Sequence, residues 1–148
     1  MNGKRLDSAK RVMSGTWGEL WLEGEYVAEC YKFQAKYTYN KEDVNICGQM
    51  MTDTKVMSIK GAGTMGLHKV SSRMAKVIGD KIRDGKDVRF TIISKLADPD
   101  SFGAERVSLS NVSFDDFTVA DWEAGVAGKI ETTFTFTESK FLDKVEVP

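Results

Sequence analysis

The sequence lacks the long apolar runs and the charge imbalance that mark membrane and nucleic-acid-binding proteins. No stretch approaches the roughly 18 consecutive apolar residues of a membrane-spanning helix, so we expect no membrane anchoring. The first 13 residues are polar and basic and do not contain the apolar core of a signal peptide. Lysine and arginine together number 21 against 22 acidic residues, so the net charge indicates no affinity for nucleic acid or membranes.

The sequence also has few of the residues from which active sites and metal centres are built. Cys30 and Cys47 are the two cysteines; they have no metal-ligand spacing, and we expect free thiols in a reducing compartment. His68, the one histidine, has no carboxylate near it in sequence and is expected to be structural. Asp98–Asp100 and Asp115–Asp116 fit turns better than calcium sites. We therefore expect no enzymatic activity, no catalytic residue, no metal and no cofactor.

One segment, Gly61–Gly66, matches the dinucleotide-binding pattern G-x-G-x-x-G. In a true site the helix opens inside the motif, so that its N-terminus meets the pyrophosphate. Here residues 67–70 intervene before a plausible helix cap at Ser71 or Ser72. The favoured interpretation is that these glycines permit close backbone approach within a strand. A nucleotide-dependent enzyme that uses this loop is kept as an alternative.

Alternation of apolar and polar residues predicts that most of the chain is β-strand. In the clearest case, residues 129–138, one face carries Ile130, Thr132, Phe134 and Phe136. The opposite face is polar and carries Glu131, Thr133, Thr135 and Thr137. Further strands are predicted at 16–22, 25–39, 88–96, 106–112 and 117–122, of which the first two form a hairpin.

One helix and one long loop complete the expected fold. An apolar stripe predicts a helix over Ser71–Asp84, and its members are Met74, Val77, Ile78 and Ile82. Residues 40–60 break the alternation and are expected to form a long loop, either folded onto its own core or making contacts between subunits. The prediction is one mainly β domain over residues 1–148, an antiparallel barrel or sandwich with one flanking α-helix.

Apolar residues outside the main strand pattern are the candidates for contacts between subunits. They are Val44, Ile46, Met50, Met51, Val56, Met57, Phe141 and Leu142. Residues 1–13 are expected to form an N-terminal arm, disordered or docked on a neighbour, and residues 139–148 a C-terminal tail. A self-assembling β-protein, with sheet edges and arms satisfied by neighbours, has this pattern. A monomeric ligand-binding β-barrel shares the alternating strands and is an alternative.

Several segments, in order along nearly the whole chain, resemble the tail tube proteins of contractile phage tails. The likeness is strongest to those of defective prophages and R-type-bacteriocin-like particles. The segments are Met13–Gly24, Phe33–Lys36, Gly61–Thr64, His68–Ser72, Asp98–Val107, Phe114–Asp115 and Phe134–Thr137. Their order and coverage carry the resemblance, since none is a catalytic signature.

The resemblance implies six copies to a ring and rings stacked into a hollow tube. The tube lies inside a contractile sheath and is driven through a cell envelope. The implied partners are further copies of the chain, the tail sheath protein, and baseplate and terminator proteins. The implied location is a virion tail or tail-like particle assembled in the bacterial cytoplasm.

In a true phage such a tube passes DNA through its lumen. A conduit for DNA must not bind it, because a basic lining would hold phosphate through counterion release. The polar face formed by Glu131, Thr133, Thr135 and Thr137 is therefore a candidate lumen lining.

Overall fold

The computed structural model describes residues 8–146, except residues 71, 74, 75, 77, 78, 80–82, 84 and 86. These residues contain two short 3₁₀ helices, at Ala9–Arg11 and Gly15–Trp17, and eight strands. The strands are β1 (Gly18–Leu22), β2 (Glu25–Tyr26), β3 (Cys30–Val44), β4 (Asp53–His68), β5 (Phe90–Leu96), β6 (Glu105–Phe114), β7 (Lys129–Phe136) and β8 (Glu138–Asp143). Their pairings are antiparallel, as predicted.

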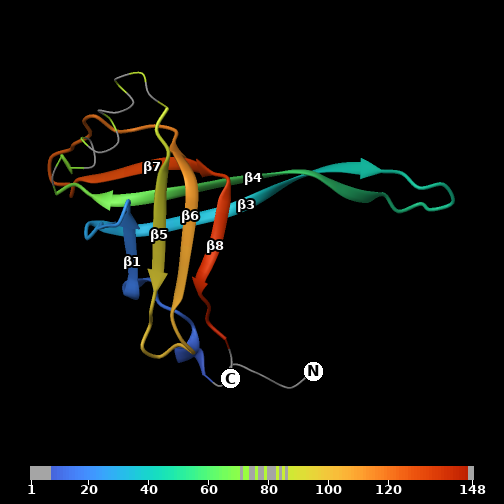
Figure 1. The fold of residues 1–148 in the computed structure, drawn as a ribbon, viewed down its shortest axis with the longest axis horizontal. Helices are drawn as coiled ribbons and strands as arrows, with labels where there is room; N and C mark the ends of the chain where they lie inside the picture. Colours follow the sequence, from blue (N-terminus) through green and yellow to red (C-terminus); the bar gives the residue numbers. More distant parts are fainter. Residues whose placement is uncertain are drawn as a thin grey trace.

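The strands form two layers that cross each other (Figure 1). Strands β2, β1, β5, β6 and β8 form one layer, sheet A, and β3, β4 and β7 form the other, sheet B. Strand β6 links them, because it pairs with β8 along residues 106–110 and with β7 at Ser113 and Phe114. The order β2-β1-β5-β6-β7-β4-β3 does not close on itself. The fold is therefore an open sandwich with crossing strands rather than a barrel.

Aromatic rings contributed by both layers meet in the core. Phe134 of β7 stacks on Phe33 of β3 at a centroid distance of 5.6 Å and lies edge-on to Phe114 of β6 at 6.1 Å. Phe114 in turn contacts Phe90 of β5 at 5.4 Å. Such offset and edge-to-face pairs add about 0.5–1.5 kcal/mol each to the stabilisation from apolar burial.

The predicted two-faced character of β7 is confirmed. Ile130, Phe134 and Phe136 are buried in the core, and Thr132 is buried among them. A buried hydroxyl needs a partner. Thr132 finds one because its Oγ1 lies 2.8 Å from the Asp116 carbonyl oxygen and 2.9 Å from Asp116 Oδ1.

The Gly61–Gly66 motif lies inside strand β4, as its strand interpretation predicts. Gly61 and Gly63 stand directly opposite Phe136 and Phe134 of β7. A Cβ atom at Gly61 would lie 2.5 Å from the Phe136 carbonyl oxygen, and one at Gly63 would overlap the Gln34 carbonyl oxygen and the Phe134 ring. The glycines thus serve close packing between strands.

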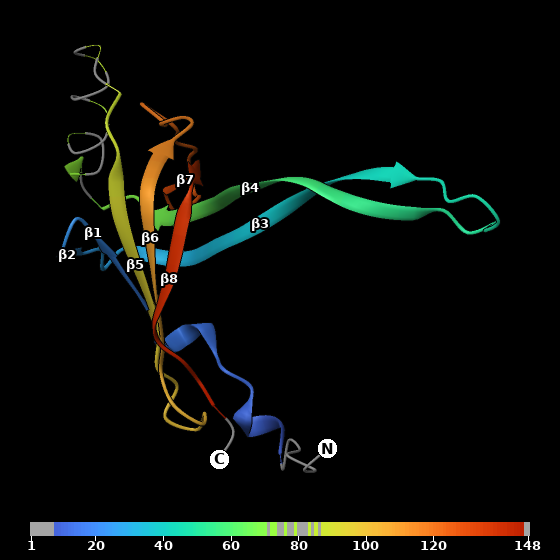
Figure 2. The ribbon, with the colours of Figure 1, turned by 45° about the vertical axis from the view of Figure 1, so that its right-hand side comes forward.

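The prediction of a long loop at residues 40–60 is wrong. Strand β3 continues to Val44 and β4 begins at Asp53, so only residues 45–52 lie between them. The two strands leave the body as a long hairpin arm, which we define as residues 37–60 (Figures 1 and 2). The broken alternation does not prevent pairing here, because Glu42 stands opposite Lys55 and opposite charges across strands stabilise a pair.

Three other predictions need correction. Strand β1 pairs with only Glu25 and Tyr26 of the predicted hairpin, after which the chain crosses to sheet B and β3 pairs with β4. Residues 117–122 are not a strand. The predicted tail contains β8, which pairs with β6. These errors share one cause, since each depends on which strand lies alongside and not on local alternation.

The chain also contains a short helical segment between β4 and β5, with helical backbone at Arg73 and Arg83. The predicted bounds Ser71 and Asp84 lie outside the described residues, as do all four members of the predicted stripe.

We expect Gly63→Ala to destabilise the fold by about 1–3 kcal/mol, because the added methyl group meets a backbone carbonyl and a packed ring. Urea unfolding of the purified chain measures this loss. Gly15→Ala is the matched control, since nothing lies within 4 Å of a Cβ atom there. Equal stability of the two variants would contradict a packing role for Gly63.

Candidate assembly surfaces

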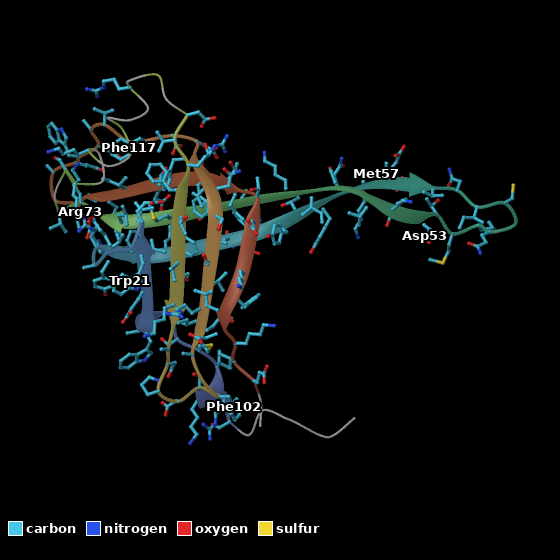
Figure 3. The ribbon with its side chains drawn as sticks, viewed as in Figure 1. Trp21, Asp53, Met57, Arg73, Phe102 and Phe117 are labelled. Atoms are coloured by element: carbon cyan, nitrogen blue, oxygen red, sulfur yellow. The ribbon has the colours of Figure 1, made fainter. Side chains whose placement is uncertain are left out.

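The hairpin arm carries the largest set of exposed apolar side chains in the described part of the chain. Met50 and Met51 at its end are 103% and 85% exposed. The remaining members are Tyr37, Tyr39, Val44, Ile46, Val56, Met57 and Ile59. Figure 3 shows Asp53 and Met57 on the arm, far from Phe102 at the other end of the body. All six interface candidates predicted in this segment are therefore exposed and gathered on one projection.

The tip of the arm is shaped by its own backbone and polar side chains. Gly48 has a φ of +83°, which glycine adopts without strain. The Gln49 amide donates to the Ile46 carbonyl at 3.1 Å, and Thr52 Oγ1 donates to Asn45 Oδ1 at 3.1 Å. These bonds fold residues 45–52 into a compact turn, and the methionine side chains project from it.

Strand β8 carries the other two predicted interface residues. Phe141 is 51% exposed and Leu142 is 38% exposed. One edge of β8 pairs with β6, and in the described residues its other edge is unpaired. Such an edge, with apolar side chains beside it, is a template for contact with another chain.

The described part of the predicted N-terminal arm lies against its own chain. Arg11 Nη1 donates to the Asp100 carbonyl at 3.2 Å, and its guanidinium lies 4.8 Å from the centroid of the Phe102 ring. The Ser14 amide donates to Asp98 Oδ2 at 2.9 Å, while Asp98 Oδ1 accepts from the Asp100 amide. Asp98 thus bonds its own turn, as predicted, and also ties residues 8–14 to it.

The polar face of β7 lies on the outside of sheet B. Thr133 Oγ1 donates to Asp115 Oδ2 at 3.1 Å, and Thr137 Oγ1 accepts from Asn111 Nδ2 at 3.0 Å. Thr135 is half-buried. Glu131 Oε1 lies 2.6 Å from Lys32 Nζ and accepts a hydrogen bond from the Tyr31 hydroxyl at 3.2 Å. The charges of Lys32 and Glu131 therefore offset one another on this face.

The hydrogen bond and charge of Lys32 lower the pKa of Glu131. The same hydrogen bond raises the pKa of Lys32. Beside them, burial raises the pKa of the Cys30 thiol to about 11, so it is protonated at neutral pH. Cys30 and Cys47 are both free, as predicted.

Residues 115–128, between β6 and β7, form a surface that sequence reasoning missed. We call this segment the Trp122 loop. Trp122 is 85% exposed and Val119 is 81% exposed. Asp115 and Asp116 fix the base of the loop to β7 through Thr133 and Thr132. The alternation over residues 117–122 predicted a strand. It shows only that apolar residues recur, and it does not show that a neighbouring strand is available for pairing.

The described residues give little support for a metal site, a site built on His68 or a membrane-spanning helix. They hold no group of three or more His, Cys, Asp or Glu residues arranged to bind a metal ion. The ring of His68 lies 4.7 Å from that of Tyr31, a packing contact. No helix in this part of the chain is both long and apolar enough to cross a membrane.

Comparison with known proteins identifies the family of the chain. The family model described as phage tail tube protein matches residues 6–143. This chain belongs to that family. The phage-like element PBSX protein XkdM of Bacillus subtilis (strain 168) is 35% identical over 139 residues, which span 93% of this chain and 95% of that protein.

Two solved structures have the same fold as this chain. The tube terminating cap of the anti-feeding prophage has a TM-score of 0.71, with 10% identity and coverage of 97% of this chain and 99% of that one. A chain of the PVC extracellular contractile injection system, in its extended sheath-tube complex, has a TM-score of 0.68, with 10% identity and coverage of 93% and 97%. At such low identity these likenesses concern the fold. The resemblance predicted from sequence is confirmed at the level of the family.

We expect Glu131→Gln to flatten the acid dependence of subunit stability. Because the folded-state pKa of Glu131 is lowered, its contribution is present at neutral pH and is lost as the pH falls through that pKa. Urea midpoints at about pH 7 and about pH 3 measure the difference. Glu138→Gln is the control, since Glu138 is exposed and forms no ion pair within the described residues. An identical pH response in both variants would contradict the prediction.

Proposed function

We propose that this chain is the subunit of the inner tube of a contractile phage tail or phage-tail-like particle, with six copies in each ring and the rings stacked. The observation that carries the proposal is the hairpin arm, whose paired strands run out from the body and end in exposed methionines. Soluble monomers rarely leave such a patch in water. Contact with a subunit of the next ring would cover it.

The free energy of burying the arm favours many weak contacts between rings over one strong contact. Burying an apolar arm side chain contributes roughly 1.5–3 kcal/mol. Strands β3 and β4 are already paired along the arm, so most of the ordering entropy, about 1–2 kcal/mol per residue, falls on residues 45–52. A single arm therefore binds weakly. Six equivalent arms in each ring make stacking cooperative.

The proposal assigns further partners by their place around a tube. The tail sheath protein lies outside it, and baseplate and terminator proteins lie at its ends. The tube is driven through a cell envelope when the sheath contracts, and DNA passes through the lumen only in a true phage. The chain itself has a structural role without catalysis. Assembly takes place in the bacterial cytoplasm, and the product is a virion tail or tail-like particle.

We place the lumen at the outer face of β7, which carries Glu131, Thr133, Thr135 and Thr137. Its hydroxyls carry no charge. Glu131 is paired with Lys32 and also lies near Lys129, so its carboxylate offsets part of the lysine charge at that end of the face. Such a surface offers phosphate few cations to hold it.

Both alternatives from the sequence lose their basis in this fold. A nucleotide site needs the glycine motif at a turn into a helix, whereas Gly61–Gly66 is paired on both sides within β4. A ligand-binding barrel needs a closed sheet, and the strand order here is open.

Electron microscopy of the purified chain at high concentration tests the proposal. We expect rings and tubes with sixfold symmetry, and a ring species of about 99 kDa, six times the chain mass of 16.5 kDa. A chain that stays monomeric at all concentrations, or forms rings of another copy number, would overturn it.

We expect the variant Met50→Ser/Met51→Ser/Met57→Ser to fold but to block tube growth. The three side chains contact no core in the subunit and would lose their apolar contact with the next ring. Negative-stain microscopy scores the tubes, and circular dichroism checks the fold. Val70→Ser, at a 77% exposed position outside the arm, is the control. Unfolding of the triple variant, or normal tubes, would contradict the prediction.

A further inference from the structure

The two layers of the body cross, and each has an inner face that extends past the other layer (Figures 1 and 2). Where the layers overlap, the two inner faces pack together. Leu20, Ile92 and Leu109 of sheet A share one buried cluster with Met65 and Phe134 of sheet B. Outside the overlap each face continues without its partner, so each layer leaves apolar side chains uncovered.

The uncovered part of sheet B lies at the root of the arm. On β3, Phe33, Tyr37 and Tyr39 share the inner face, because even numbers of residues separate them. The Tyr37 hydroxyl lies 2.6 Å from Ser139 Oγ of β8 in sheet A. Farther out, Tyr39 stands opposite Ile59, and the two are 54% and 58% exposed. We call Tyr37, Tyr39 and Ile59 the arm-root patch.

The uncovered part of sheet A lies where its strands pass β3. On β6, Leu109 is buried, whereas Val107, two residues away on the same face, is half-buried. Phe141 of β8 stands opposite Val107 and therefore shares its face; it is 51% exposed. On β5, Leu96 continues the face of the buried Ile92 and is half-buried. We call Leu96, Val107 and Phe141 the sheet A patch.

A cleft of about 540 Å³ lies between the sheet A patch and the edge of β3. Leu96 and Val107 line it from sheet A, and Phe33 and Ala35 line it from β3. Strand β3 ends the strand order and pairs with β4 alone among the described strands, so its other edge is unpaired. Sheet B thus stops at β3, and among the described residues no further strand continues it beneath the sheet A patch.

We propose that the arm-root patch of one copy packs on the sheet A patch of an adjacent copy. The arm of the first copy then lies next to β3 of the second, where sheet B stops. The contact repeats between copies the packing of inner face on inner face that forms the core of each chain. The inference rests on the proposed function, because it assumes that copies of this chain assemble.

Continuity with the core selects a second copy as the occupant. Each patch extends one of two faces that already fit each other, so the arm of another copy supplies the kind of surface that the sheet A patch lacks. One contact covers both patches, and every copy carries one of each. The Trp122 loop, or an unrelated protein, would cover one patch and leave the other in water. None of the six patch residues is charged, so the contact buries no charged patch side chain.

Cross-linking between two differently tagged variants tests the contact directly. Both variants carry Cys30→Ser and Cys47→Ser. One adds Ile59→Cys on the arm, and the other adds Ser94→Cys, a position opposite Val107 on the inner face of sheet A. A short thiol-reactive cross-linker should join the two variants at concentrations at which the chain assembles.

Ser108→Cys replaces Ser94→Cys in the control. Ser108 is also a half-buried serine of sheet A, but it follows Val107 directly and so lies on the outer face. Absence of the Ile59–Ser94 product, or an equal yield with Ser108→Cys, would overturn the proposal. Preferential linking of Ser94→Cys to a Val119→Cys variant would also overturn it, because the Trp122 loop would then be the occupant.

The concentration needed for assembly provides a second measurement. Tyr39→Ser and Phe141→Ser should each raise it about tenfold or more. Circular dichroism should show an unchanged fold, because both side chains are exposed. The double variant should raise it by less than the product of the two single effects, because residues in contact are coupled. Val70→Ser, at a 77% exposed position outside both patches, is the control.

Together the two measurements separate this inference from the proposed function. If the variants assemble as readily as the natural chain, or if their two effects multiply in full, the docking proposal fails while the tube function stands. If the natural chain forms no rings or tubes but gives the Ile59–Ser94 product, as a reciprocal dimer would, the tube function fails while the docking stands.

Discussion

Close packing of β7 against β4 is the constraint on which the rest of this structure depends. Phe134 and Phe136 stand directly opposite Gly63 and Gly61, where any side chain would meet a ring or a carbonyl oxygen. Cross-strand aromatic residues shield such glycines and fix the register. This contact aligns β4, and β4 in turn aligns β3, whose Phe33 ring stacks on Phe134.

The register set in the core extends into the arm. Strands β3 and β4 stay paired from Cys30 to Val44, with irregularities between Cys30 and Lys32 and between Asn40 and Lys41. A slip of one residue would turn every side chain to the opposite face. The core register therefore determines that Tyr37, Tyr39 and Ile59 share one face of the arm. The arm is positioned by the body, although none of its tip side chains contacts the core.

Sequence alone could predict features that depend on local alternation. The buried and polar faces of β7 follow directly from its period of two, and the glycine motif could be assigned to a strand because no helix opens within it. The same reasoning selected the eight interface candidates, because they are apolar residues outside the strand pattern. All eight are exposed. It could not show that Glu42 and Lys55 stand opposite one another, because cross-strand pairing depends on residues distant in sequence.

Other features were hidden for the same reason. Asn111 has a φ of +58° and lies where the pairing of β5 with β6 is irregular, so Leu109 and Val112 are both buried despite an odd spacing. The Trp122 loop has strand-like alternation over residues 117–122, but in the described part of the chain this stretch is not paired with any strand. Asp116 could be assigned to a turn from sequence, yet its bond to the buried Thr132 required two segments to meet.

The two layers have unequal lengths, and this leaves apolar side chains of the longer layer in water. Sheet A ends at β8, while the inner face of sheet B continues into the arm with tyrosine and isoleucine side chains. Among the described residues of one chain nothing covers that face, and the open strand order leaves edges unpaired. Supplying the missing cover from another copy removes apolar surface from water without any change in the fold. The arm also holds its tip, residues 45–52, far from the body (Figure 2), so the tip is free to contact a copy that the body does not touch.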